Sequence, residues 1–181
     1  MPVLMVMAHG SESLESVTVM NVLRRVGLEV QTASIEPGEK TVRASRGIEL
    51  SCDHAYADVA GLGFAMIVLP GGEAGARRLA QTPALIDQLK AQRQAHRWTA
   101  AICAAPALVL SPHGLLDGKQ ATCFPAFHDQ LLHFVDRPVV VDGHCVTAQG
   151  PASAIAFALT LVEVLIGPAK RREVAQALLA E

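Results

Sequence analysis

Short, uninterrupted apolar runs alternate with segments of helical periodicity along the whole chain. Runs typical of strands buried on both faces occur at 3–8, 64–69 and 98–102, and each is followed by a segment typical of a helix. Parallel neighbours of such strands need long crossover connections, which helices supply. The pattern therefore predicts an α/β fold: a three-layer sandwich with a mostly parallel central sheet and helices on both faces.

The remaining elements follow from the same periodicities and from Gly and Pro punctuation. Further strands are expected at 28–34 and 121–124, a peripheral strand or hairpin at 42–50, and a hairpin formed by 139–141 and 144–148. Helices are expected at 14–26, 76–96 with a break near Pro83, 104–110, 151–166 and 169–180. The 181 residues contain no repeat or linker, so we expect a single domain over 1–181.

Charge and composition exclude several classes of protein. With 15 basic and 17 acidic side chains and 4% aromatic residues, a dedicated nucleic-acid binder is not expected. No apolar run is long enough to span a membrane, and the N-terminus lacks a basic leader. The four cysteines show no disulfide spacing, so we expect a soluble cytoplasmic protein. No metal site and no cofactor are predicted, because no zinc-ligand spacing or phosphate loop is present.

Cys103 is the candidate reactive residue. It follows the expected strand 98–102 directly and precedes the expected helix 104–110, where unpaired N–H groups and the helix dipole favour a thiolate. The alternative is a buried cysteine that only packs. That interpretation is kept for the cysteines without a helix opening after them: Cys52, Cys123 and Cys145.

Two other loops at strand ends carry candidate residues. Gly71 and Gly72 follow the expected strand 64–69, where backbone N–H groups could form an oxyanion hole, although Pro-Gly-Gly is also an ordinary turn. Glu15 lies in the first turn of the first expected helix. It is either an exposed charge that complements the helix dipole or a buried, protonated carboxyl beside Cys103.

These motifs together resemble the ThiJ/PfpI superfamily, and more narrowly the branch that contains the parkinsonism-associated protein deglycase and the bacterial protein YajL. The resemblance covers nearly the whole chain. It rests on AAICAAP at 100–106, HGSE at 9–12 with Glu15, VLRRVG at 22–27, ASR at 44–46, VLPGG at 68–72 with 75–76, and GP at 150–151 before FAL at 157–159.

The resemblance implies a flavodoxin-like fold, a homodimer, and Cys103 as the reactive, easily oxidised residue. It implies that Glu15 is protonated and donates to the sulfur, and that the N–H groups of Gly72 and Ala104 are oxyanion donors. Arg46 would lie near the dimer interface and tune the redox potential of the site.

One position departs from some members of the family, which carry a histidine where this chain has Phe124. Phenylalanine cannot shuttle a proton, so a Cys-His dyad and peptidase or amidase activity are disfavoured. His9 ends the first expected strand and, with Gly71 and Phe124, is a candidate for contact with substrate.

Two functions follow as hypotheses. The first is cysteine-dependent detoxification of reactive dicarbonyls, either free, as in conversion of methylglyoxal to lactate, or attached to protein or nucleotide. The second is an oxidation-sensing stress protein or holdase chaperone that uses the same cysteine.

Overall fold

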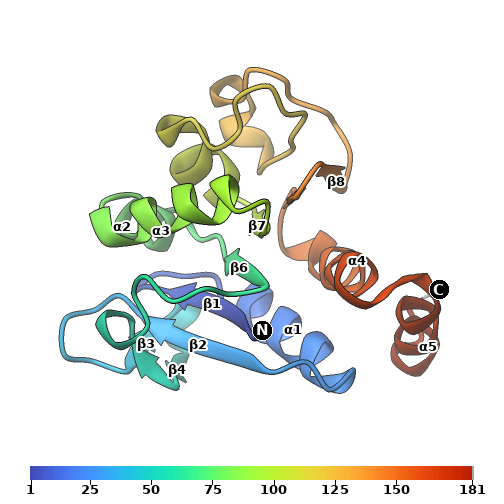
Figure 1. The fold of residues 1–181 in the computed structure, drawn as a ribbon, viewed down its shortest axis with the longest axis horizontal. Helices are drawn as coiled ribbons and strands as arrows, with labels where there is room; N and C mark the ends of the chain where they lie inside the picture. The colour runs from blue at the N-terminus through green and yellow to red at the C-terminus, as the bar shows by residue number, and fades with distance from the viewer. Residues whose placement is uncertain (181) are drawn as a thin grey trace.

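The computed structural model describes residues 1–180 and has the predicted layered architecture (Figure 1). A seven-stranded sheet has the order β5-β2-β1-β6-β7-β9-β8, and each neighbouring pair is parallel except the edge pair β8 and β9. Its strands are β1 (Val3–Met7), β2 (Val30–Ser34), β5 (His54–Ala55), β6 (Met66–Leu69), β7 (Trp98–Ile102), β8 (Val139–Asp142) and β9 (Cys145–Ala148).

Helices cover both faces of this sheet, as the flavodoxin-like expectation requires (Figure 1). The helices are α1 (Ser13–Arg25), α2 (Glu73–Ala80), α3 (Pro83–Gln94), α4 (Ala154–Ile166) and α5 (Pro168–Leu178). On one face α4 packs between α1 and α5, and on the other α3 packs against α2 and β7. A small antiparallel hairpin, β3 (Thr41–Arg43) and β4 (Glu49–Ser51), lies outside the sheet.

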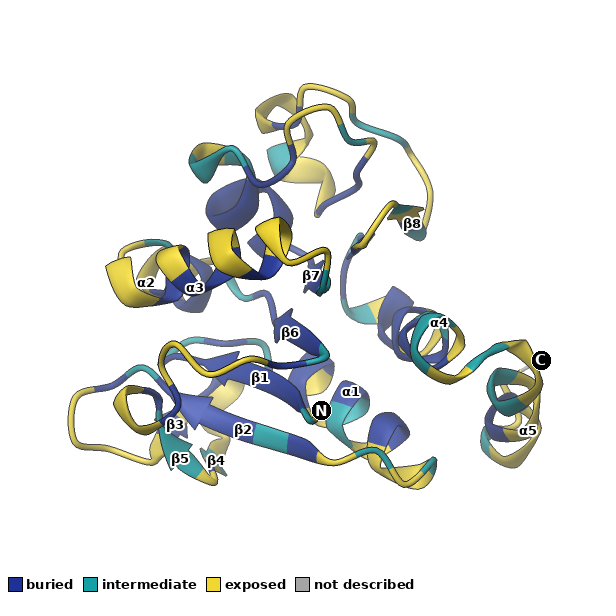
Figure 2. Ribbon diagram, in the orientation of Figure 1, coloured by how far each residue is buried: buried dark blue, intermediate teal, exposed yellow. Residues whose placement is uncertain are grey.

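The central strands are the core of the molecule (Figure 2). Every residue of β1 and of β6 is fully buried, because helices cover both faces of these strands and leave no solvent-facing side for polar residues. The neighbours β1, β6, β7 and β9 are parallel, so their carboxyl ends meet at one edge of the sheet. This is the edge where open α/β sheets bind ligands.

Most predicted elements are confirmed, with small shifts at their ends. The break expected near Pro83 in the helical segment 76–96 is confirmed: the segment is two helices, α2 and α3, because Pro83 opens a new first turn. The expected helix 104–110 is a π-helical turn, Pro106–Leu110. The peripheral segment 42–50 is the β3–β4 hairpin, and 139–148 is the β8–β9 hairpin.

The predicted strand at 121–124 is wrong. This segment makes one isolated bridge, between Ala121 and Phe134, rather than a strand. Its other backbone groups bond elsewhere: the Thr122 N–H donates to the Thr147 hydroxyl at 3.0 Å, and the Phe124 N–H donates to the Cys103 carbonyl at 2.8 Å. Ala121, Thr122 and Cys123 are buried and Phe124 is half-exposed, and the hydrogen bonds of the segment fix a loop rather than a strand.

No helix within residues 1–180 has both the length and the apolar composition needed to cross a bilayer.

Candidate active site

Cys103 lies on a strained turn at the carboxyl end of β7. Its φ is 63°, a left-handed backbone conformation that is uncommon for a residue with a side chain. Two hydrogen bonds hold this conformation: the Cys103 N–H donates to the Ala148 carbonyl at 2.9 Å, and the Cys103 carbonyl accepts the Phe124 N–H at 2.8 Å. Such strain persists only where the surrounding structure enforces it, and it is concentrated at functional sites.

Glu15 brings a carboxyl to the same place from α1. It is the third residue of the helix and is fully buried, which excludes the interpretation as an exposed helix-terminal charge. Its Oε2 accepts the Gly71 N–H at 2.8 Å. Its Oε1 is buried without a hydrogen-bond partner among residues 1–180, and the Cys103 thiol is the polar side chain beside the carboxyl. An unpaired buried oxygen favours the neutral, protonated form of an acid.

Burial raises the pKa of Glu15 from an ordinary 4.5 to about 7, although the Gly71 N–H and the Cys103 thiol act to lower it. The negative charge of Glu12 adds a smaller upward contribution. A carboxyl with a pKa near neutrality can both give and take a proton under the same conditions, which is the property of a general acid–base group.

Burial also raises the pKa of the Cys103 thiol to about 12, and the negative charge of Glu15 acts in the same direction. The N–H groups of Gly72 and Ala104 point to the sulfur and act to lower the pKa of the thiol. The amides alone therefore do not keep the sulfur ionised at neutral pH, contrary to the simplest expectation from its position before a helix. A thiolate forms most readily when Glu15 holds the proton, because the two negative charges then do not coexist.

Two glycines let the loop after β6 approach this pair. A Cβ on Gly71 would lie 2.4 Å from the Cys103 Cβ and 2.8 Å from the Glu15 Oε2, so any side chain there would displace one of them. Gly72 has a φ of 80°, and its Cβ would lie 2.2 Å from the Gly10 carbonyl oxygen. The close approach brings the Gly71 N–H to the carboxyl and the Gly72 N–H to the sulfur.

The other candidate residues lie at varying distances from this centre. Phe124 is half-exposed, and its ring lies 3.4 Å from the position of a Gly150 Cβ. The His9 side chain is held elsewhere: its Nδ1 accepts the Arg43 N–H at 2.9 Å, and its Nε2 lies 3.5 Å from the Glu39 carboxylate. Contact of His9 with substrate stays a prediction.

Arg46 occupies the turn between β3 and β4, with a φ of 59°, and its side chain is exposed. It borders an open groove that is also lined by Leu14, Val17 and Ile48. Arg46 therefore lies beside α1, and its role at an interface stays a prediction.

One supporting interaction is not predicted by the sequence. The Ser45 hydroxyl donates to the Glu12 Oε1 at 2.7 Å and accepts the Ser13 N–H at 3.0 Å, which ties the hairpin turn to the start of the helix that carries Glu15. No local pattern signals it, because Ser45 and Glu12 are 33 positions apart. Long-range pairing of this kind depends on the tertiary fold.

The remaining thiols differ from Cys103 in their surroundings. All four cysteines are free, and burial raises the pKa of Cys52 and Cys123 to about 11 and that of Cys145 to about 12. None of these three receives backbone N–H groups as Cys103 does. Within residues 1–180 no group of three His, Cys, Asp or Glu side chains is arranged to hold a metal ion.

The chain is similar to several known proteins. The family model described as DJ-1/PfpI family matches residues 1–164. Protein DJ-1 homolog A of Arabidopsis thaliana is 42% identical over 98% of this chain, which spans 46% of that relative. The Caenorhabditis elegans protein named glutathione-independent glyoxalase DJR-1.2 is 34% identical over 88% of this chain and 86% of its own length. The solved structure of oxidized Toxoplasma gondii DJ-1 superposes with a TM-score of 0.96 at 40% identity, covering 98% of this chain and 97% of that one.

Proposed function

The chain belongs to the DJ-1/PfpI family, and we propose that it is a cysteine-dependent, glutathione-independent glyoxalase that converts small dicarbonyls such as methylglyoxal to 2-hydroxy acids. One observation carries the proposal: a buried carboxyl with a pKa of about 7, Glu15, lies beside the Cys103 thiol. A relative that is 34% identical bears the name of this activity. Dicarbonyl adducts on proteins or nucleotides are the second substrate class of the same chemistry.

The reaction begins with the transfer of the thiol proton. Glu15 as carboxylate takes the proton from Cys103, and the sulfur adds to the aldehyde carbon of the dicarbonyl to form a hemithioacetal. The aldehyde oxygen becomes an oxyanion, and we assign its stabilisation to the N–H groups of Gly72 and Ala104, which point to the sulfur. Glu15 then returns its proton to this oxygen.

The second stage moves a hydrogen between the two carbons. The Glu15 carboxylate removes the proton from the former aldehyde carbon and delivers it to the neighbouring carbonyl carbon. The hydroxyl proton of the hemithioacetal passes to the former ketone oxygen, which leaves a thioester and a hydroxyl group. Water attacks the thioester and releases lactate and the Cys103 thiol. The aldehyde carbon is oxidised and the ketone carbon is reduced within one molecule, so the reaction balances without an external oxidant, reductant or cofactor.

Phe124 makes Glu15 the sole carrier of the proton in this scheme. A histidine at that position would be a second base, whereas a phenyl ring neither accepts nor donates a proton. This favours isomerisation of a small carbonyl compound over peptide hydrolysis, in which the leaving amine must be protonated by a strong general acid.

Lactate formation from methylglyoxal tests the proposal. We expect turnover by the wild type without glutathione, background turnover by Cys103→Ala, and a loss of about 10²–10⁴-fold in kcat for Glu15→Gln. Cys52→Ala is the matched control, because that thiol is buried without amide donors. Retention of turnover by Cys103→Ala would overturn the mechanism.

A second function, an oxidation-sensing stress protein or holdase chaperone, is favoured by the same amides. Sulfinate oxygens on Cys103 would be acceptors for the Gly72 and Ala104 N–H groups and for a protonated Glu15. We expect mild peroxide to add two oxygens at Cys103 before any other cysteine, as measured by peptide mass spectrometry. Equal oxidation of all four cysteines would contradict it.

We also propose that the protein acts in the cytoplasm as a homodimer. The groove beside Arg46 is lined by exposed apolar side chains, those of Leu14 and Val17 on α1 and of Ile48 in the β3–β4 turn. Such a contiguous surface is typical of an interface. Light scattering is expected to give twice the chain mass for the wild type and the mass of a single chain for Val17→Asp.

A further inference from the structure

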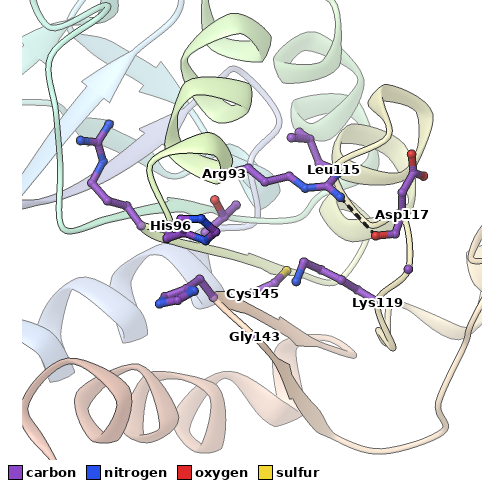
Figure 3. A pocket seen from close by; sticks show the side chains of 11 residues that line it. Arg93, His96, Leu115, Asp117, Lys119, Gly143 and Cys145 are labelled. Carbon is purple, nitrogen blue, oxygen red and sulfur yellow. Dashed lines mark hydrogen bonds between the residues drawn. The ribbon is translucent and has the colours of Figure 1, made fainter.

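A cavity lies at the end of the sheet opposite to Cys103. Its volume is about 320 Å³, and it is bordered by the end of α3, the loop 115–119 and the turn between β8 and β9 (Figure 3). Thr99 near the start of β7 and Cys145 at the start of β9 are its buried floor. Thr99 lies in β7 and Cys103 directly follows this strand, four residues on, which is about 13 Å at the usual rise of a strand. The cavity is therefore separate from the candidate active site.

Positive charge dominates the lining of this cavity. Three basic side chains, those of Arg93, Arg97 and Lys119, border it together with one carboxylate, Asp117. Within residues 1–180 none of the three cations forms an ion pair with a carboxylate. Arg97 is directed elsewhere, since its Nε donates to the Gln92 side chain at 2.8 Å. Arg93 and Lys119 are the cations that remain.

The hydrogen bonds of these two cations leave most of their donors free. Arg93 donates to the Gly114 carbonyl and, at 3.2 Å, to the Asp117 carbonyl, which uses two of its five N–H groups. Lys119 donates to the Asp142 carbonyl at 3.3 Å, which uses one of three. Neutral carbonyl groups do not compensate a full positive charge, so the cations keep both charge and donors for a ligand.

The nearby carboxylates do not neutralise Arg93 and Lys119. The Asp142 carboxylate accepts the Gln120 N–H at 2.9 Å. The Asp117 carboxylate lies 3.0 Å from the position of a Gly114 Cβ, and Figure 3 shows it directed away from Lys119. On the opposite wall the rings of His96 and His144 lie 6.0 Å apart, and they add donors rather than negative charge.

We propose that this cavity binds a small phosphomonoester, with the phosphate held between Arg93 and Lys119 and the organic part directed to His96 and His144. A phosphate group matches the site because it carries up to two negative charges and three acceptor oxygens. A carboxylate carries one charge and two oxygens, and it would leave one cation without a counter-charge. The volume of about 320 Å³ limits the ligand to the size of a small metabolite.

The chain contains a built-in reporter for this site. Trp98 is its single tryptophan, and its ring lies 5.1 Å from that of His144. Fluorescence of Trp98 can therefore follow binding without an activity assay, and calorimetry measures the same titration as heat. The probes are glycerol 3-phosphate and inorganic phosphate, with glycerol and acetate as the uncharged and carboxylate controls. None of these probes contains an absorbing ring.

We expect saturable binding of both phosphate probes, none of glycerol, and at least about tenfold weaker binding of acetate. Lys119→Gln should weaken glycerol 3-phosphate binding about tenfold, and Lys119→Arg should retain it, because the charge remains. Arg77→Gln is the matched control, since Arg77 pairs with Glu73 on the surface of α2.

Arg93→Gln provides a second variant, read together with its melting temperature because Arg93 also holds two carbonyl groups. Binding of acetate as tight as that of phosphate would overturn the proposal. So would an unchanged affinity in Lys119→Gln, or the absence of both heat and fluorescence change with glycerol 3-phosphate. These outcomes do not depend on whether Cys103 performs the proposed glyoxalase reaction.

Discussion

The Glu15 carboxyl lies beside the Cys103 thiol, and burial raises the pKa of both groups. The two residues come from different elements, α1 and the turn after β7, and the Gly71 loop packs between them. Negative charge on Glu15 opposes negative charge on the sulfur. The pair therefore favours one negative charge over two, and its proton can be exchanged between oxygen and sulfur during a reaction.

The raised pKa of Glu15 predicts how stability depends on pH. The folded protein binds the Glu15 proton more tightly than the unfolded chain, because the pKa rises from 4.5 to about 7 on folding. Its contribution is fully present below about pH 4.5 and is lost as pH rises through 7. Between about pH 5 and about pH 8 the free energy of unfolding therefore falls by about 2–3 kcal/mol through Glu15.

Urea unfolding of the wild type and of Glu15→Gln at these two pH values measures this contribution. The variant carries a neutral amide at both, so its free energy of unfolding should fall less with rising pH than that of the wild type. Glu39→Gln, at an exposed carboxylate, should keep the wild-type slope. Parallel slopes for the wild type and Glu15→Gln would show that Glu15 is already ionised at low pH.

The same pair predicts the reactivity of the thiol. In Glu15→Gln the negative charge that raises the pKa of Cys103 is absent, so its alkylation midpoint should move to lower pH. Peptide mass spectrometry after iodoacetamide labelling at a series of pH values gives this midpoint. Cys123 provides an internal reference, because burial alone raises its pKa. A midpoint for Cys103 that rises in the variant would mean that Glu15 stabilises the thiolate in the wild type.

The fold follows from the sequence where periodicity is long and unambiguous. The uninterrupted apolar run of β1 is short and bounded by loop residues, and the helical spacing of α1 extends over several turns, so both elements can be identified from the sequence. The segment 121–124 misleads for the opposite reason: three of its four residues are buried, as in a strand, but its N–H groups bond to a side chain and to loop carbonyls. The two-residue strand β5 is too short to leave a pattern.

The candidate site is predictable in position but not in its electrostatics. A cysteine between a buried strand and a turn of helix is expected at the ligand-binding edge, and Cys103 is there. The direction in which the pKa of Cys103 shifts depends on burial and on the charge of Glu15. Only tertiary packing brings Glu15 beside Cys103. The hydrogen bond between Ser45 and Glu12 also cannot be predicted from the local sequence.

Removal of the Ser45 hydroxyl is expected to loosen the connection between the β3–β4 hairpin and α1. Ser45→Ala loses the bond to Glu12 and leaves the Ser13 N–H without its acceptor, at a cost of about 1–2 kcal/mol in the free energy of unfolding. Chemical denaturation measures the loss, and Ser51→Ala, at an exposed position in β4, is the matched control. Equal stability of the two variants would show that water replaces the Ser45 hydroxyl without cost.

Gly71 is expected to tolerate no side chain. Alanine there would place its Cβ 2.4 Å from the Cys103 Cβ and 2.9 Å from the Ile102 carbonyl oxygen, and the backbone oxygen cannot move without disturbing β7. Overpacking of this kind costs about 1–3 kcal/mol, and displacement of the thiol should also lower kcat in the methylglyoxal assay. Gly63→Ala is the control, because its Cβ would meet only the flexible ends of Met1 and Arg97, at 3.2 and 3.3 Å. Wild-type stability and turnover in Gly71→Ala would mean that the loop shifts freely, and the close placement of Glu15, Gly71 and Cys103 would then not matter for the reaction.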